Sequence, residues 1–463
     1  MNQNSPMSDL SIREFGYIIQ KEAKEDSSGD ESATGSSIDV VAVDKKAWDY
    51  LENYAYSSDK DDRFIRPSNY RGKKALQIAN FVGVITIPDD IHLEILPKTS
   101  EVSQNLVKTR QLLVRMLVEV NELPFIQSTK AGVEIFEKPL PDVLITLFLK
   151  QLADVVRKGI RKDYERIEAE ERFLKGRLLV SQQISQPVSR RHLFCIAYDV
   201  FSENRAENRL IHSALIQVAK WSKSEANQKK ARELRFAFNE IPTSTDYKTD
   251  FSLWRNSRDM ISYKHLLYWV KLILNQQSPF SIKGDSKGIS FLFPMETLFE
   301  KYVASILEKQ AQKNYSRYKV KKQVNTKYLA KKHEDEVDRG VFQLKPDLAI
   351  FEGNSSIETT ICILDTKWKL IDQNAKYDNG NVDNKAGISQ GDMYQMFAYG
   401  HKYLKEGKGK LVLIYPKWIN FVKEECFVLD DDLNLEVFPF NLDNADNSAN
   451  ALLKKLEQKN NDL

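Results

Sequence analysis

The chain has 463 residues, 29% of them charged, and a formal net charge of +3, so its average charge neither requires nor excludes a nucleic-acid partner. Its three cysteines are far apart, which argues against a disulfide framework or a zinc finger and fits a reducing cytoplasm. The start of the chain is polar, and no apolar run approaches the length of a membrane span. We therefore expect a cytoplasmic protein of two or three domains with no membrane partner.

Residues 1–100 have the pattern of a small mixed α/β domain. We expect a short strand at 12–19, a strand and then a helix between residues 38 and 55, and two strands between residues 75 and 98. Residues 21–37 are rich in Ser, Gly, Glu and Asp and have little to bury. That composition predicts a flexible insertion.

Residues 101–290 are predicted to form a mainly helical middle domain. Helical periodicity covers residues 104–122, Leu140 to about Glu171, 203–222 and 258–275. From Arg157 to Arg191 there are ten Lys or Arg against five Asp or Glu. This excess indicates either a phosphate-contacting surface or a solvated helix face followed by a loop.

Residues 291–463 change in character. An amphipathic helix is predicted at Met295–Leu307, with Glu296 and Glu300 four residues apart on one face. Lys313 to Lys332 then contains eight Lys or Arg and no acid. In this segment Arg317, Lys319 and Lys321 alternate with apolar or aromatic residues, which predicts a cationic strand face. Such a face suits a DNA backbone, although a merely solubilising face has the same pattern.

The strongest chemical signal lies between Lys345 and Tyr399. Pro346-Asp347 is followed by the apolar run Ile361–Leu364, which leads directly into Asp365, eighteen residues after Asp347, and then into Thr366 and Lys367. Side chains alternate along a strand, so Asp365 and Lys367 should project together while Thr366 points away. A carboxylate at the end of a buried strand is costly unless it is paired or bound to a metal. Two such oxygen donors suit Mg²⁺ and metal-assisted attack on a phosphodiester, whereas an isolated D-x-K triplet is more often a salt-bridged strand end.

A following helix carries Gln395 and Tyr399, four apart and therefore on one face. With Asp347, Asp365 and Lys367, these residues resemble the PD-(D/E)xK nuclease superfamily, whose RecB-like branch has a Q-x-x-x-Y element. The resemblance implies a restriction-endonuclease-like α/β domain at residues 291–463. Asp347 and Asp365 would hold Mg²⁺, with Glu300 and the carbonyl of Thr366 as further ligands. Lys367 would act on the attacking water, and Gln395 and Tyr399 would position the site or the DNA.

A closer resemblance extends over nearly the whole chain. The segments IREFGYI, VGVITIPDDIHLEILPK, LKGRL, YDVFSENRAENRLI, LFEKYV, KPDLAIF, ILDTKWK and QGDMYQMFAYG, in this order, are similar to the McrC subunit of McrBC-type restriction systems. The resemblance implies a nuclease subunit whose partners are double-stranded DNA and a McrB-type AAA+ GTPase ring, with its N-terminal part docked into the ring. The chain has no G-x-x-x-x-G-K-[ST] motif. We therefore expect that this chain itself neither binds nor hydrolyses a nucleotide.

Two alternatives stay open at this stage. The chain could be a non-catalytic adaptor that activates an AAA+ ring and keeps its nuclease fold for binding. It could also be a stand-alone nuclease similar to RecB-like repair enzymes, which would cut DNA with Mg²⁺ but without a partner or a nucleotide.

Overall fold

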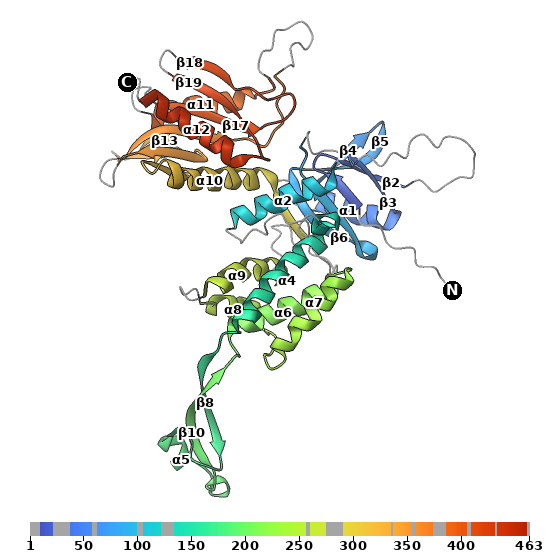
Figure 1. Ribbon diagram of the computed structural model, residues 1–463, viewed down its shortest axis with the longest axis vertical. Coiled ribbons are helices and arrows are strands. Elements are labelled where there is room, and N and C mark those ends of the chain that lie inside the picture. Colours follow the sequence, from blue (N-terminus) through green and yellow to red (C-terminus); the bar gives the residue numbers. More distant parts are fainter. Residues whose placement is uncertain are drawn as a thin grey trace, which may run out of the picture. The chain divides into compact units, whose positions relative to one another are not determined.

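The structure is a computed structural model that describes residues 10–21, 38–57, 63–99, 105–121, 134–255, 260–274, 290–334, 337–353, 358–373, 386–404, 409–430 and 433–460. From residue 22 onward, the predicted flexible insertion lies outside these ranges. The chain divides into two compact units. The first unit contains Met1–Gly83, Ile87–Glu137 and Leu292–Leu463, and the second contains Val84–Thr86 and Lys138–Phe291. Helices and strands occur in both units, which confirms a mixed α/β multidomain protein; the predicted three-domain division stays a prediction (Figure 1).

Two four-stranded sheets form the N-terminal part of the first unit. One has the order β1-β7-β6-β11, with strands Leu10–Arg13, Ile91–Leu96, Phe81–Ile87 and Ser290–Pro294. The other has the order β3-β2-β5-β4, with strands Val40–Val43, Tyr17–Gln20, Lys73–Ile78 and Ile65–Tyr70. Helix α1 (Lys45–Ser57) contacts this sheet (Figure 1). The strand and helix predicted between residues 38 and 55 are therefore confirmed as β3 and α1.

Two strand predictions in this region were wrong in number. The segment 12–19 is split into β1 and β2 by a turn at Phe15, whose φ of 61° lies in the left-handed region. Gly16 completes this turn, because a Cβ there would meet the Arg13 carbonyl oxygen at 2.8 Å. Residues 75–98 contain parts of three strands, β5, β6 and β7, because a second break falls between Ile78 and Phe81.

Helix α2 (Leu106–Val120) is fixed to this region by a buried ion pair. Arg110 Nε and Nη2 donate to the two carboxylate oxygens of Glu94 on β7, at 2.6 and 2.7 Å. Both side chains are almost fully buried, and a two-point hydrogen bond of this kind fixes direction as well as distance. At the other end of α2, Glu119 accepts hydrogen bonds from Ser305 and Lys309 of helix α10 (Met295–Asn314).

The C-terminal part of the first unit is built on a six-stranded sheet. Its order is β12-β15-β16-β17-β19-β18, with strands Tyr318–Lys322, Leu348–Glu352, Thr359–Thr366, Lys410–Pro416, Leu433–Phe440 and Glu425–Asp430. Helix α11 (Gln390–Tyr403) packs through Met396, Tyr399 and Tyr403 on the face that carries Ile363 and Leu411. Alternate residues such as Cys362 and Leu364 are also fully buried, so both faces of β16 are covered.

Further elements complete this part of the unit. Helix α10 and helix α12 (Ala445–Asn460) contact each other, and they contact β16 and β19 respectively. Strands β13 (Lys327–Glu334) and β14 (Val337–Leu344) pair as a separate antiparallel hairpin. The helix predicted at 295–307 and the helix predicted to carry Gln395 and Tyr399 are confirmed as α10 and α11, although α10 continues to Asn314.

The second unit combines a helical body with a long hairpin (Figure 1). Its helices are α4 (Leu140–Lys158), α6 (Ala206–Trp221), α7 (Glu225–Arg235), α8 (Tyr247–Leu253) and α9 (Ile261–Leu274). Strands β8 (Asp163–Glu171), β9 (Arg177–Leu178) and β10 (Phe194–Ser202) form a sheet of order β8-β10-β9, and the short helix α5 (Val180–Ile184) lies between β9 and β10. In Figure 1 this hairpin extends away from the helices.

The prediction of one helix from Leu140 to Glu171 was wrong beyond Lys158. Gly159 has a φ of 96° and ends α4, because other residues adopt this conformation only with strain. The charged residues that follow form strand β8 instead of a solvated helix face. Among the described residues, no helix is long and apolar enough to cross a membrane.

Candidate active site

Asp347 and Asp365 lie next to each other at one end of the six-stranded sheet. Strand β15 runs antiparallel to β16, with Leu348 opposite Leu364. The residue before Leu348 therefore lies beside the residue after Leu364. Asp365 is 1% exposed, and its burial, followed by the negative charge of Asp347, raises its pKa. The fold thus brings together the two carboxylates that are eighteen residues apart in the sequence.

Thr366 holds Asp347 in place. Its backbone N–H and its hydroxyl both donate to Asp347 Oδ2, each at 2.7 Å. Thr366 is predicted to point away from Asp365, and its contacts are made instead to the other carboxylate. These two hydrogen bonds fix one oxygen of Asp347 and leave its second oxygen for another ligand.

Lys367 follows strand β16 and turns back to Asp365. Its Nζ lies 2.8 Å from Asp365 Oδ2, and its backbone N–H donates to the Ile414 carbonyl of β17 at 2.9 Å. Although burial opposes its charge, attraction to Asp365 raises the pKa of Lys367 above its ordinary value. The lysine is therefore held as an ammonium beside the two carboxylates.

Gln395 and Tyr399 of helix α11 continue this network. Lys367 Nζ donates to Gln395 Oε1 at 3.1 Å, and Gln395 Nε2 donates to the Tyr399 hydroxyl at 2.7 Å. The Tyr399 hydroxyl in turn donates to the carbonyl of Lys345, two residues before Asp347, at 3.0 Å. One chain of hydrogen bonds therefore runs from the ammonium back to the segment that carries the first carboxylate.

The structure distinguishes Glu296 from Glu300 on helix α10. Glu300 is half-buried and accepts from Gln323 Nε2 at 3.1 Å, and Gln323 N–H donates to the Asp347 carbonyl. Burial, followed by the charge of Asp347, raises the pKa of Glu300. Glu296 is exposed, and its negative charge is instead one of the smaller causes of the raised pKa of Glu14, after burial. Glu300 is thus the glutamate of this helix that faces the aspartate pair.

Asp392 is part of this site and was not predicted from the sequence. Its Oδ1 lies 3.9 Å from Lys367 Nζ, and its Oδ2 accepts from the Tyr415 hydroxyl at 3.2 Å. Its position three residues before Gln395 places both on one face of α11. That spacing is the signal that could have found it.

The electrostatics at the sheet end disfavour the charge of the Asp365 carboxylate. Burial, followed by repulsion from Asp347, raises the pKa of Asp365 despite the nearby ammonium of Lys367. Asp365 Oδ2 is buried and makes the ion pair without the geometry of a hydrogen bond. In the described part of the chain, no group of three or more His, Cys, Asp or Glu side chains is arranged to hold a metal ion. Asp347 and Asp365 are the two adjacent carboxylates here that could contribute to holding a metal ion.

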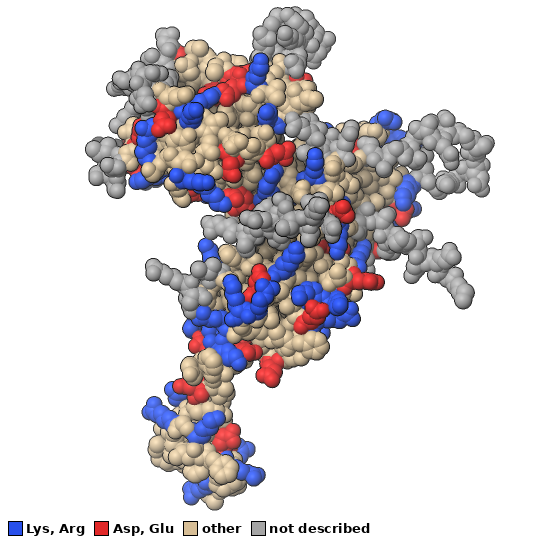
Figure 2. All heavy atoms as spheres, in the orientation of Figure 1, with Lys and Arg blue, Asp and Glu red and all other residues tan. Residues whose placement is uncertain are grey.

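The cationic strand predicted for DNA contact is largely neutralised. Lys319 and Lys321 on β12 both form ion pairs with Glu358, and Lys322 pairs with Glu308. Figure 2 shows positive and negative side chains interspersed over the visible face of this part of the molecule. The segment has no acid in its own sequence, but the fold brings acids from other segments to it.

Gly400 lets helix α11 approach the sheet closely. A Cβ at this position would meet two side-chain carbons of Leu433 at 2.5 and 2.8 Å. We expect Gly400→Ala to destabilise the protein by about 1–2 kcal/mol and to lower activity further by moving Gln395 away from Lys367. Gly391→Ala on the same helix is the matched control, because its Cβ would meet only Ser389 Oγ at 3.7 Å. Equal activity of the two variants, measured below their unfolding temperatures, would refute this role.

Comparison with known proteins extends this description. Comparison with curated proteins gives no significant match. A refined half-complex from a tetradecameric assembly of Thermococcus gammatolerans McrB AAA+ hexamers with bound McrC is similar in structure, with a TM-score of 0.65 and 16% identity, covering 97% of this chain and 100% of that chain. This similarity shows a shared fold. The cryo-EM structure of the Thermococcus gammatolerans McrBC complex also matches, with a TM-score of 0.46 and 21% identity, over 65% of this chain and 88% of that one.

The sequence itself matches a protein family over most of its length. Residues 76–416 fit the family described as McrBC 5-methylcytosine restriction system component. The matched region includes every residue of the site described above. The chain therefore belongs to the family of McrBC 5-methylcytosine restriction system components.

Proposed function

We propose that this chain is the Mg²⁺-dependent DNA endonuclease subunit of a GTP-dependent, McrBC-like restriction system. The observation that carries the proposal is the convergence of Asp347, Asp365 and Lys367 at one end of a sheet. The domain would be of the PD-(D/E)xK type and would cleave phosphodiesters of double-stranded DNA when joined to a McrB-type AAA+ GTPase.

The residues present fit a magnesium ion. Mg²⁺ keeps several of its waters and is commonly bound through one or two carboxylates, so a pair of aspartates is a sufficient ligand set. Asp347 and Asp365 would hold the ion, with Glu300 and the Thr366 carbonyl as further ligands. When bound, the ion would polarise the phosphate and its water ligand.

The remaining chemistry is assigned to side chains of this chain. Lys367 would orient or deprotonate the attacking water and offset the charge that grows on the phosphate. Gln395 holds the lysine through its Oε1, and Tyr399 holds Gln395 through its hydroxyl. Asp392 adds negative charge near the ammonium and so favours its charged form.

The deciding experiment is plasmid cleavage by the purified chain. We expect cleavage only when a McrB-type partner, GTP and Mg²⁺ are all present, and we expect the chain to stimulate GTP hydrolysis by the partner. Cleavage with Mg²⁺ alone would support a stand-alone nuclease. Stimulated GTP hydrolysis without cleavage under any divalent metal would support the adaptor. Methylated and unmethylated plasmids, compared in the same assay, would show whether methylation is required.

The hairpin of the second unit offers a candidate binding surface for a protein partner. Its distal part, residues 172–193, exposes several large apolar side chains: Phe173, Leu174, Val180, Ile184 and Val188. Phe173 is 81% and Ile184 is 76% exposed, and apolar surface lies between the charged residues of this part in Figure 2. A cluster of exposed apolar side chains on a soluble chain indicates a binding surface. The predicted docking segment was the N-terminal part, and the hairpin is a second candidate.

We expect the double substitution Phe173→Ser and Ile184→Ser to weaken binding to the McrB-type partner by about ten-fold or more. Truncating an anchor residue of an interface costs the complex on the order of 2 kcal/mol of binding free energy. Binding would be measured with GTP present, together with the stimulation of GTP hydrolysis. Phe236→Ser is the control, because Phe236 is 75% exposed in the same unit but lies outside the hairpin. Unchanged binding by the double variant would rule out the hairpin as an anchor.

A further inference from the structure

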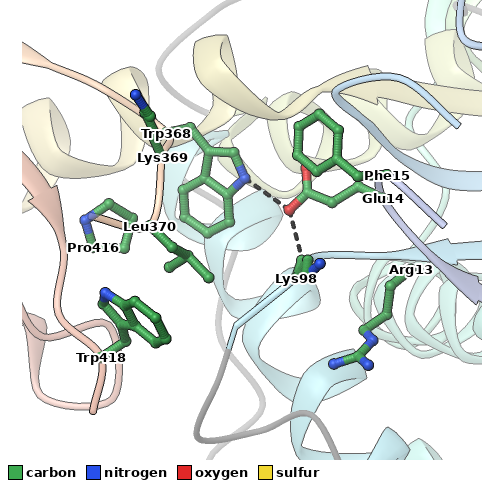
Figure 3. Close-up of a pocket in the computed structure, with 9 residues that line it drawn as sticks. All are labelled: Arg13, Glu14, Phe15, Lys98, Trp368, Lys369, Leu370, Pro416 and Trp418. Carbon is green, nitrogen blue, oxygen red and sulfur yellow. Dashed lines mark hydrogen bonds between the residues drawn. The ribbon is translucent and has the colours of Figure 1, made fainter. Parts of the chain in front are cut away.

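The first unit contains a cavity that is lined in part by the three residues directly after Lys367, the proposed catalytic lysine. It has a volume of about 560 Å³. Its lining comes from the end of β1, from Lys98 after β7, from Trp368 to Leu370 after β16, and from Pro416 and Trp418 at and after the end of β17. Figure 3 shows these side chains around the cavity, with Glu14 hydrogen-bonded to Trp368 and Lys98.

Glu14 lies in the wall of this cavity and has no exposed surface. Its Oε1 accepts two hydrogen bonds, from the Trp368 indole N–H and from the Lys98 backbone N–H, both at 2.7 Å. Its Oε2 is buried and has no hydrogen-bond partner among the described residues. A buried polar atom of this kind is costly unless a ligand or a water meets it. The Glu14 carboxyl therefore holds Trp368 in the cavity wall and is not itself open to a ligand.

Flat aromatic side chains form much of the remaining wall. Trp418 is half-buried, and Phe15 is 41% exposed in the strained turn between β1 and β2. Trp368 is held in place by Glu14 on one side and by Phe299 of α10, at a ring-centroid distance of 5.2 Å, on the other. Strained backbone that presents a large apolar side chain to a cavity is a feature found at ligand sites. A planar apolar ligand would stack on such walls.

The charges of the lining select among planar ligands. Arg13 is balanced by Asp39 at 2.5 Å, whereas Lys98 and Lys369 add two positive charges. Lys369 Nζ donates to the Gly387 carbonyl, which does not neutralise it. Burial raises the pKa of Glu14 to about 8, so its carboxyl is mostly neutral at pH 7. The lining is thus positive overall, which disfavours a cationic side chain and favours a ligand that carries phosphate.

We propose that this cavity binds one unpaired nucleotide of a DNA strand, with its base against Trp418 and Phe15 and its phosphate near Lys98 and Lys369. The inference rests on the proposed function, because Trp368 directly follows Lys367. A nucleotide held here would contact the segment that directly follows Lys367.

The test measures binding of a short single strand that contains 2-aminopurine, with EDTA present so that no cleavage occurs. The fluorescence of 2-aminopurine falls when the base stacks on an aromatic ring. We expect the full chain to lower it, and we expect Trp418→Leu and Phe15→Leu each to weaken binding by about ten-fold, within the usual range for loss of one stacking partner. Lys402→Ala, an exposed lysine of α11 outside the cavity, is the matched control and is expected to bind as the wild type does.

Three further probes give the other outcomes. A fully paired duplex, the mononucleotide dCMP and a lysine-rich peptide are titrated in parallel with the strand, and circular dichroism checks that each variant is folded. Wild-type binding by both folded cavity variants would overturn the proposal. Binding of dCMP but not of the strand would identify a free nucleotide as the occupant and would also overturn it. Tighter binding of a lysine-rich peptide would identify a cationic occupant instead. Because none of these readings needs cleavage, they stay interpretable if the nuclease proposal fails.

Discussion

Asp365→Asn is expected to lower DNA cleavage by about 10³-fold or more while leaving the chain folded, because this carboxylate is proposed both to bind the metal and to pair with Lys367. Its stability should be unchanged or higher. Burial and the neighbouring Asp347 raise the pKa of Asp365, which means that its charge is unfavourable in the fold. The neutral amide of nearly the same shape removes that cost.

Lys367→Met should give a similar loss of cleavage for a different reason, because it removes the ammonium that faces Asp365 and Gln395. Cleavage of plasmid with a McrB-type partner, GTP and Mg²⁺ is measured beside stimulation of GTP hydrolysis, which both variants should retain. Lys402→Ala is the control for removing a positive charge. Full cleavage by either Asp365→Asn or Lys367→Met would defeat the assignment of the active site.

Glu14 is expected to make the stability of the chain depend on pH. Burial raises its pKa from 4.5 to about 8, so the folded chain holds a proton that the unfolded chain releases at neutral pH. The stabilisation linked to this proton is fully present below about pH 4.5 and is lost as pH rises through about 8. A pKa difference of this size corresponds to roughly 4–5 kcal/mol as an upper bound.

Glu14→Gln isolates this contribution, because the amide oxygen can still accept from Trp368 and Lys98 but the side chain carries no charge. Chemical unfolding of both proteins at about pH 5 and about pH 9 gives the difference, and titrations common to the two proteins cancel. The wild type should lose more stability than Glu14→Gln over this interval. Glu225→Gln, at an exposed position, should behave as the wild type does. Parallel pH curves for wild type and Glu14→Gln would show that the buried carboxyl is not the cause.

The placement of Lys367 beside Asp365 could be predicted from the sequence because local rules determine it. The apolar run before Asp365 predicts a buried strand, and alternation along that strand predicts that Asp365 and Lys367 project together. The spacing of Gln395 and Tyr399 predicts a shared helix face in the same way. Each of these inferences needs only the period of one element.

Other features could not be predicted because they depend on contacts between distant segments. Glu358 lies 39 residues after Lys319 and neutralises it, and no local pattern places the two together. Strand β8 was mistaken for helix because its charged residues fit either period, and the conformation of Gly159 decides the outcome. The spacing of Asp392 from Gln395 indicates a shared helix face, but its approach to Lys367 depends on how α11 packs on the sheet.

The hydrogen bond between Glu14 and Trp368 joins residues 354 positions apart. A fragment that began at residue 291 would keep both aspartates and Lys367, yet it would lack the acceptor that anchors the indole next to that lysine. Shortening the chain in this way should therefore loosen the segment that follows Lys367. Glu14, the residue directly after the first strand, thus stabilises a segment near the far end of the same compact unit.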